Sequence, residues 1–91
     1  MAVEVKIPTV FRKFTDQQAT VQVEAGTIGD VISRLNERFP TLRSQLLTED
    51  GEIHRFVNIY LNDEDVRYLD KLATRADDGD TVALLPSVAG G

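Results

Sequence analysis

One amphipathic segment in the middle of this 91-residue chain constrains its fold more than any other feature. Thr27 and Asp30 predict an approximate capping box at the start of a helix, and Pro40 disfavours helical geometry at Phe39 and so ends it. The apolar residues of the segment recur at intervals of three and four, which places them on one side of that helix: Ile28, Val31, Ile32, Leu35 and Phe39. A helix with a single apolar side needs other elements to cover that side.

The apolar stripe of this helix has two possible uses, as core or as a surface for a partner. We interpret it as core, because a small sheet needs a helix to cover one of its faces. The other positions are polar, and we expect all of them to face water: Ser33, Arg34, Asn36, Glu37 and Arg38.

Apolar and polar residues alternate before the helix, which is the pattern of half-buried strands. The alternation covers residues 3–7, with Val3, Val5 and Ile7 directed to the core, and returns in residues 20–24. The connection between these two strands is short, and we therefore expect them to be antiparallel.

A run rich in β-branched and aromatic residues predicts a strand from Ile53 to Leu61. Its alternation places Phe56, Asn58 and Tyr60 on the outward face. His54 lies near the start of this run and has no nucleophile near it in the sequence, so we interpret it as a strand-entry residue rather than a catalytic base.

Two shorter strands are predicted after that run. Val66–Tyr68 is interpreted as a short edge strand, and residues 69–76 as an irregular or single-turn connection. The acidic turn at residues 77–80 leads into a last strand, residues 81–86, whose Leu85 points outward. We interpret the acidic residues of the turns as turn formers that also keep the chain soluble.

The order of these elements indicates an α+β fold in which one main helix covers a mixed sheet of about five strands. If the last strand lies parallel to the first, the helix belongs to the crossover between them, and the arrangement is a β-grasp. No repeat or linker divides the chain, so we expect one domain over residues 1–86 and a flexible tail over residues 87–91.

Composition excludes several classes of function. A net charge of -5 argues against nucleic-acid binding, and no apolar run approaches the roughly 20 residues of a membrane-spanning helix. The absence of cysteine excludes disulfides and thiolate metal sites, and a single histidine excludes a multi-histidine zinc site. We therefore expect a cytoplasmic protein without a metal, whose partner is another protein.

The sequence ends in small residues and two glycines, Gly90 and Gly91. One interpretation is an ordinary frayed terminus. The other is that a tail without large side chains threads a narrow channel and presents the α-carboxylate of Gly91 for reaction. A carboxylate is a poor electrophile, so a separate enzyme would have to activate it, for instance as an acyl-adenylate made from ATP.

Residues 78–91 follow the pattern Asp-Gly-Asp-x-Val-Ala-x-x-Pro-x-Val-x-Gly-Gly. This pattern resembles the C-terminal signature of the ubiquitin-like sulfur-carrier proteins, which include the small subunit of molybdopterin synthase and the carriers for thiamine and cysteine biosynthesis. Residues 26–32 and 7–9 resemble the helix start and the first strand exit of the same family. The segment from His54 to Arg67 is most similar to the carrier of the protein-thiocarboxylate route to cysteine.

This resemblance implies that the chain is a protein co-substrate rather than an enzyme and binds no cofactor. A ubiquitin-activating-type adenylyltransferase and sulfurtransferase would use ATP to convert Gly91 to a thiocarboxylate. The sulfur would then pass to a cysteine synthase-like acceptor enzyme, and a peptidase would release the product. We expect partner enzymes to dock on outward apolar residues that lead to the tail: Phe56, Tyr60, Leu85 and Val88.

Three other functions stay open at this point. The chain resembles the small subunit of molybdopterin synthase, although Leu85 stands where many of those subunits have phenylalanine and Ser87 where a second proline is common. It also fits a ubiquitin-like modifier joined to lysines of target proteins. A passive β-grasp interaction module would not need its terminal glycines.

Overall fold

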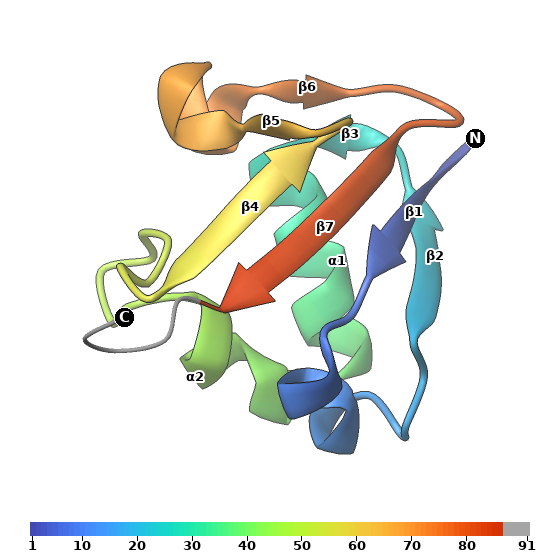
Figure 1. Cartoon of the computed structure of the whole chain (residues 1–91), viewed down its shortest axis with the longest axis vertical. Helices are drawn as coiled ribbons and strands as arrows, with labels where there is room; N and C mark the ends of the chain where they lie inside the picture. The colour runs from blue at the N-terminus through green and yellow to red at the C-terminus, as the bar shows by residue number, and fades with distance from the viewer. Residues whose placement is uncertain (87–91) are drawn as a thin grey trace.

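A five-stranded mixed sheet with one covering helix forms the fold in the computed structural model, which describes residues 1–86 (Figure 1). The sheet has the strand order β2-β1-β7-β4-β5. Its strands are β1 (Ala2–Lys6), β2 (Thr20–Glu24), β4 (Val57–Leu61), β5 (Glu64–Asp65) and β7 (Thr81–Pro86).

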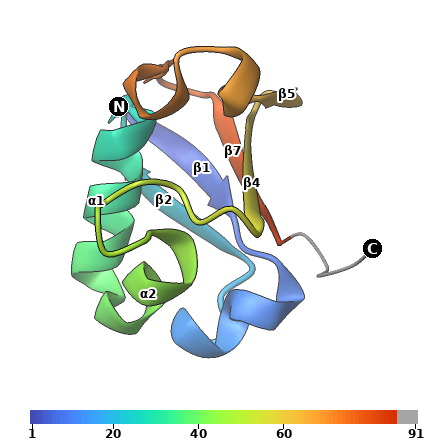
Figure 2. The same cartoon turned by 90° about the vertical axis from the view of Figure 1, so that its left-hand side faces the viewer.

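The first and last strands lie side by side in the centre of this sheet and run parallel, while every other neighbouring pair is antiparallel. The main helix, α1 (Ile28–Arg38), packs against one face of the sheet and leaves the other face open (Figure 2). The prediction of an α+β β-grasp fold is therefore confirmed, including the parallel pairing that makes the helix part of a crossover.

The start of α1 follows from two side chains that satisfy the free backbone N–H groups there. The N–H of Asp30 donates to Thr27 Oγ1 at 3.0 Å, and the N–H of Thr27 donates to Asp30 Oδ2 at 3.1 Å. This is the predicted capping box, with aspartate in place of the usual glutamate or glutamine. The helix ends at Arg38, next to Phe39 and Pro40, as predicted.

The apolar stripe of α1 is core, as predicted, because all five of its residues are buried against the sheet. The inward residues of the strands complete the same cluster, among them Val5, Ile59 and Leu84. The expectation for Asn36 was wrong. Its side chain is only 8% exposed, because the segment after α1 folds back along this flank of the helix.

Short elements connect the main ones. A second, two-stranded sheet pairs β3 with β6 and lies at the start of α1. These elements are η1 (Thr9–Phe14), β3 (Gly26–Thr27), η2 (Pro40–Leu42), α2 (Arg43–Leu46), η3 (Val66–Tyr68), η4 (Lys71–Ala73) and β6 (Arg75–Ala76).

The prediction of an edge strand at Val66–Tyr68 was wrong. The edge strand is β5, which follows β4 at once because Asn62 and Asp63 both adopt positive φ, as a tight hairpin turn requires. Val66–Tyr68 is a turn of 3-10 helix instead, in which Asp65 accepts the N–H of Arg67 and Val66 is buried in the core.

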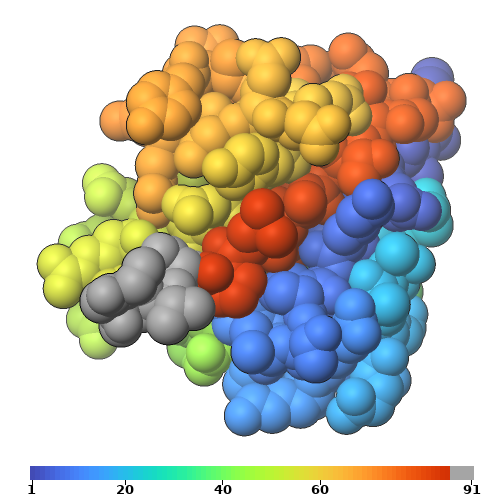
Figure 3. Space-filling view, viewed as in Figure 1, coloured from blue at the N-terminus to red at the C-terminus, as the bar shows by residue number. Residues whose placement is uncertain are grey.

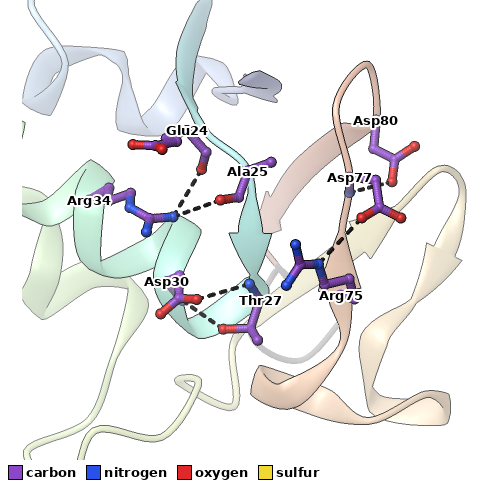
Figure 4. A network of polar contacts seen from close by, with 8 residues as sticks. All are labelled: Glu24, Ala25, Thr27, Asp30, Arg34, Arg75, Asp77 and Asp80. Carbon is purple, nitrogen blue, oxygen red and sulfur yellow. Dashed lines mark hydrogen bonds and ion pairs between the residues drawn. The ribbon is translucent and has the colours of Figure 1, made fainter. Parts of the chain in front are cut away.

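The free edge of β2 is covered by two arginines of α1. The N–H of Ile7 donates to the Ala19 carbonyl, and the N–H of Ala25 donates to the Met1 carbonyl. In an antiparallel pair, residues that bond to the neighbouring strand alternate with residues that do not, so the carbonyls of Gln22 and Glu24 point away from β1. Arg38 donates to the Gln22 carbonyl at 2.7 Å. Arg34 donates to the carbonyls of Glu24 and Ala25 at 3.1 and 3.0 Å (Figure 4). We name Arg34 and Arg38 the arginine clamp.

Within residues 1–86, no helix has the length and the apolar character to cross a membrane. The same residues contain no group of three or more His, Asp or Glu side chains that could hold a metal ion. The predicted tail, residues 87–91, lies outside the described residues, so the domain boundary at residue 86 stays a prediction.

Candidate functional site

The predicted site falls into two parts. Val88, Gly90 and Gly91 lie outside the described residues, so their roles stay predictions. Phe56, Tyr60 and Leu85 are described, and all of them lie in or next to the neighbouring strands β4 and β7.

Leu85 and Tyr60 lie on the open face of the sheet, as predicted. In the antiparallel register Leu85 is opposite Asn58 and Tyr60 is opposite Ala83, and directly opposed residues share one face. Leu85 is 45% exposed and Tyr60 is partly buried. Figure 3 views this face, with β7 (red) between β4 (yellow) and the N-terminal strands (blue). We name Leu85, Tyr60 and Asn58 the open-face patch.

Phe56 is exposed at the end of this patch, but its predicted place in a strand was wrong. The strand β4 begins only at Val57, and residues 54–56 form a turn before it. The reason is a pair of backbone bonds: the N–H of His54 donates to Leu46 O at 2.8 Å, and the N–H of Val57 donates to His54 O at 2.9 Å. His54 therefore belongs to the turn and not to the strand.

The ring of Phe56 has charged and polar neighbours in this turn. Its centroid lies 5.3 Å from that of the His54 imidazole, and the Arg55 guanidinium lies 4.9 Å from it, within the range of a cation–π interaction. The N–H of Phe56 donates to His54 Nδ1 at 3.3 Å. An apolar ring with 40% exposure and a cation beside it suits a partner surface that is both apolar and acidic.

Arg67 is a residue of this region that the sequence did not single out. Its Nη1 donates to Asn58 Oδ1 at 2.8 Å, and its Nη2 donates to the carbonyls of Arg55 and Val57 at 3.2 and 2.8 Å. Arg67 thus fixes the turn and the first part of β4, against which the end of β7 is paired. No local sequence pattern predicts this role, because the hydrogen-bond partners of Arg67 lie nine to twelve positions away in the sequence.

The last described residues of the chain belong to this same corner of the sheet. Pro86 is opposite Val57 at the end of the β4–β7 ladder, directly after Leu85. Pro86 therefore borders the open-face patch and the turn at residues 54–56, which we name the Phe56 turn. The predicted tail follows Pro86 in the sequence.

The acidic turn at the other end of β7 has structural partners, as predicted. The N–H of Asp77 donates to Asp80 Oδ2 at 2.8 Å, and the N–H of Ala2 donates to Asp78 Oδ1 at 2.9 Å. The bond from Asp77 and a second one from the Asn62 side chain lower the pKa of Asp80 below its ordinary value. These carboxylates hold the turn before β7, and Leu85 lies near the opposite end of that strand.

Comparison with known proteins identifies relatives over the whole chain. The sulfur carrier protein CysO of Mycobacterium tuberculosis is 47% identical over 93 residues, with 100% of both chains covered. Small archaeal modifier protein 3 of Haloferax volcanii is 38% identical over 94 residues, again with 100% of both chains covered.

Solved structures give the same result for the fold. A chain in the crystal structure of the Amycolatopsis orientalis BexX/CysO complex superimposes with a TM-score of 0.91 at 40% identity, covering 99% of this chain and 100% of that chain. The ThiS family matches residues 5–91, a range that includes both terminal glycines. This chain therefore belongs to the ThiS family of ubiquitin-like sulfur carriers.

Proposed function

We propose that this chain carries sulfur as a thiocarboxylate on Gly91 and donates it for the synthesis of cysteine. The observation that carries the proposal is the 47% identity, over the full length of both chains, to a protein named as a sulfur carrier. The cysteine-free composition agrees with it, since sulfur held on a C-terminal carbonyl needs no thiol of the chain itself.

The proposed chemistry has two steps, both carried out by a partner enzyme. An oxygen of the Gly91 carboxylate attacks the α-phosphate of ATP, which gives an acyl-adenylate and releases pyrophosphate. A sulfide or persulfide sulfur then attacks the acyl carbon, the C–O bond to AMP breaks, and a thiocarboxylate remains after any persulfide S–S bond is reduced by a thiol. In this proposal the chain is the substrate, holds no cofactor itself and acts where ATP is available, in the cytoplasm.

The open-face patch and the Phe56 turn are proposed to hold the adenylating enzyme. They contain Phe56 and Leu85, two exposed apolar side chains beside the end of β7, and exposed aromatic and aliphatic side chains are frequent anchors of protein interfaces. Arg55 and Arg67 add positive charge at this corner, which favours an acidic surface on the partner.

Intact mass spectrometry tests the first part of this proposal. The chain is incubated with ATP, sulfide and the adenylating enzyme encoded near it in the genome. We expect a mass increase that corresponds to the exchange of one oxygen for sulfur, and no increase in a chain that lacks Gly91. An unchanged mass with an enzyme that is active on another carrier would contradict the proposal.

The acceptor is tested by supplying the thiocarboxylated chain to two purified systems. With an activated serine derivative on a cysteine synthase, we expect a cysteinyl adduct on Gly91, because an acyl shift from sulfur to the neighbouring amine forms a stable amide. A peptidase would then release cysteine. Formation of a pterin dithiolene by the large molybdopterin synthase subunit, with no cysteinyl adduct, would overturn the cysteine assignment.

A second candidate function is protein modification, which the 38% identity to a small archaeal modifier protein favours. In that case the activated Gly91 would form an isopeptide bond with a lysine of a target protein. Tryptic digestion of the host proteome, followed by mass spectrometry, would detect lysines that carry residues 76–91, the fragment after the last arginine of the chain, and this modification would disappear when the gene is deleted.

A further inference from the structure

The edge of β4 that faces away from β7 has only a short strand beside it. This strand, β5, consists of Glu64 and Asp65 and pairs with Tyr60 and Leu61 at the far end of β4 (Figure 1). Within residues 1–86, no strand pairs with the first three residues of β4 on this edge. Backbone carbonyls on such an edge are free to accept hydrogen bonds from side chains.

Arg67 supplies the donors on this edge. It lies in η3, directly after β5, and its Nη2 donates to the carbonyls of Val57 at 2.8 Å and Arg55 at 3.2 Å. Its Nη1 donates to Asn58 Oδ1 at 2.8 Å. All three acceptors are neutral oxygens of the Phe56 turn or of the start of β4. One guanidinium therefore takes the place of the missing strand there.

These bonds hold the backbone on both sides of Phe56, because Arg55 precedes this residue and Val57 follows it. Phe56 is exposed and does not belong to the core cluster, so core packing does not fix the position of its ring. The position of the ring therefore depends on the backbone of the turn. Two backbone bonds at His54 also close the turn, so the sheet should stay folded without Arg67.

We propose that Arg67 is a positioning residue for the adenylation of Gly91, which holds the Phe56 turn in the arrangement that the adenylating enzyme binds. This inference rests on the proposed function. Arg67 acts through Phe56 in it, and not through a contact of its own with the enzyme. A chain whose turn is ordered for only part of the time binds more weakly by that fraction. The effect belongs in KM, because a chain that has docked correctly reacts as the parent does.

Steady-state kinetics test the proposal, with each full-length variant as the substrate of the adenylating enzyme in the presence of ATP and sulfide, and with pyrophosphate release as the readout. Arg67→Gln should raise the KM for the chain about tenfold, as expected if the turn is ordered in about a tenth of the free chains, and should leave kcat within twofold of the parent. Arg67→Lys keeps the charge but lacks the two nitrogens of the guanidinium fork, so it should raise KM at least fivefold.

Two further variants separate positioning from a general loss of stability. In a Phe56→Ala background, Arg67→Gln should raise KM by less than a further twofold, because the ring through which Arg67 acts is already absent. Arg34→Gln is the matched control. It also removes the bonds of one guanidinium to two backbone carbonyls, next to β2, and should leave KM unchanged at concentrations where the variant is monomeric.

Hydrogen exchange of the free chain, followed by NMR, provides a readout without the enzyme. The N–H of Val57 donates to the His54 carbonyl within the turn, and it should exchange at least fivefold faster in Arg67→Gln. The amide of Tyr60, in the β4–β7 ladder, should exchange as in the parent.

Three results would overturn this inference and leave the proposed function intact. The first is a KM of Arg67→Gln within twofold of the parent. The second is a parent-like KM of Arg67→Lys, which would mean that the charge itself contacts the enzyme. The third is a full tenfold increase from Arg67→Gln in the Phe56→Ala background. A parent chain that the enzyme does not adenylate would contradict the proposed function, and this inference with it.

Discussion

The free edge of β2 and the open face of β4 and β7 are both exposed parts of one sheet. They differ in whether other side chains of the chain cover their exposed groups. At β2 the outward carbonyls of Gln22 and Glu24 already have donors from the arginine clamp. On the open face, Leu85 remains 45% exposed, and no element within residues 1–86 covers it. Another strand can pair with an edge whose carbonyls are free, whereas an exposed apolar side chain can pack against the surface of a partner protein.

This difference indicates which part of the sheet is available for contact with another protein. The side chains that cover the β2 edge come from the polar side of α1, for which its sequence pattern predicts only contact with solvent. Covering the edge removes a place where copies of the chain could pair. The exposed apolar side chains beside the end of β7, Phe56 and Leu85, stay available to a partner enzyme.

The largest expected effect is on the open face. Leu85→Asp should weaken binding to the adenylating enzyme about thirtyfold or more, about 2 kcal/mol, because the charge is desolvated in the interface. Isothermal titration calorimetry with the purified enzyme measures the change. Tyr60→Asp should act in the same direction, and both variants should remain folded because neither side chain is fully buried.

Thr20→Asp is the matched control for this prediction. It adds the same charge to the same sheet, at an exposed position of β2 whose register partner is Lys6. We expect binding as in the parent chain. If both open-face variants bind like the parent, those residues are not part of the interface.

The next effect concerns the closed edge. Replacing both arginines of the clamp, Arg34→Gln with Arg38→Gln, should lower the free energy of unfolding by about 1–3 kcal/mol, since each net hydrogen bond contributes about 0.5–1.5 kcal/mol. The uncovered carbonyls should also promote pairing between copies. Chemical denaturation measures the first effect and analytical ultracentrifugation the second.

The lysine pair, Arg34→Lys with Arg38→Lys, keeps a donor at both positions and should stay monomeric. A glutamine variant that is as stable and as monomeric as the parent would show that the clamp does not protect the edge.

A smaller effect is expected at Gly26, which lies beside the clamp. A Cβ atom there would come within 2.8 Å of Arg34 Nη1 and 2.9 Å of Asp30 Oδ2, so both side chains would have to move. Gly26→Ala should therefore lower the free energy of unfolding by about 1 kcal/mol, the value of the lost hydrogen bonds. In an Arg34→Gln background the loss should shrink, which a double-mutant cycle would measure. Additive losses would contradict the link to the clamp.

The smallest effect is a pH dependence at the start of α1. The N–H and hydroxyl of Thr27 lower the pKa of Asp30, helped by the nearby Arg34 and Arg75. A carboxyl with a lowered pKa in the folded state stabilises above its ordinary pKa of 3.8 and loses that contribution as the pH falls through the folded value. Unfolding measured between neutral pH and this acid range should be flatter in Asp30→Asn. An identical pH profile would be the contrary outcome.

The sequence predicted the fold because the signals that specify it are local. Alternation, the capping box at Thr27 and Asp30, and Pro40 each act within a few residues, and the parallel pairing of β1 and β7 follows from covering one sheet with one helix. The site was predicted only in part. Leu85 and Tyr60 lie where alternation placed them, because β7 and the end of β4 are regular strands.

Residues whose roles depend on distant segments were missed or misplaced. Arg67 donates hydrogen bonds to groups nine to twelve positions away. The N–H of His54 donates to the Leu46 carbonyl, and His54 therefore lies in a turn and not in the strand. Asn36 has the polar character of a surface residue, and its burial depends on how the loop after α2 returns to the helix. None of these contacts leaves a periodic pattern in the sequence.

The most direct test of the distinction between the two regions is an NMR map of the bound chain. The chain, labelled with ¹⁵N and at its methyl groups, is titrated with unlabelled adenylating enzyme. We expect the largest shifts and line broadening at Asn58, Tyr60 and Leu85, and no change in residues 20–24 of β2. Perturbations centred on residues 20–24, with Leu85 unchanged, would contradict this expectation.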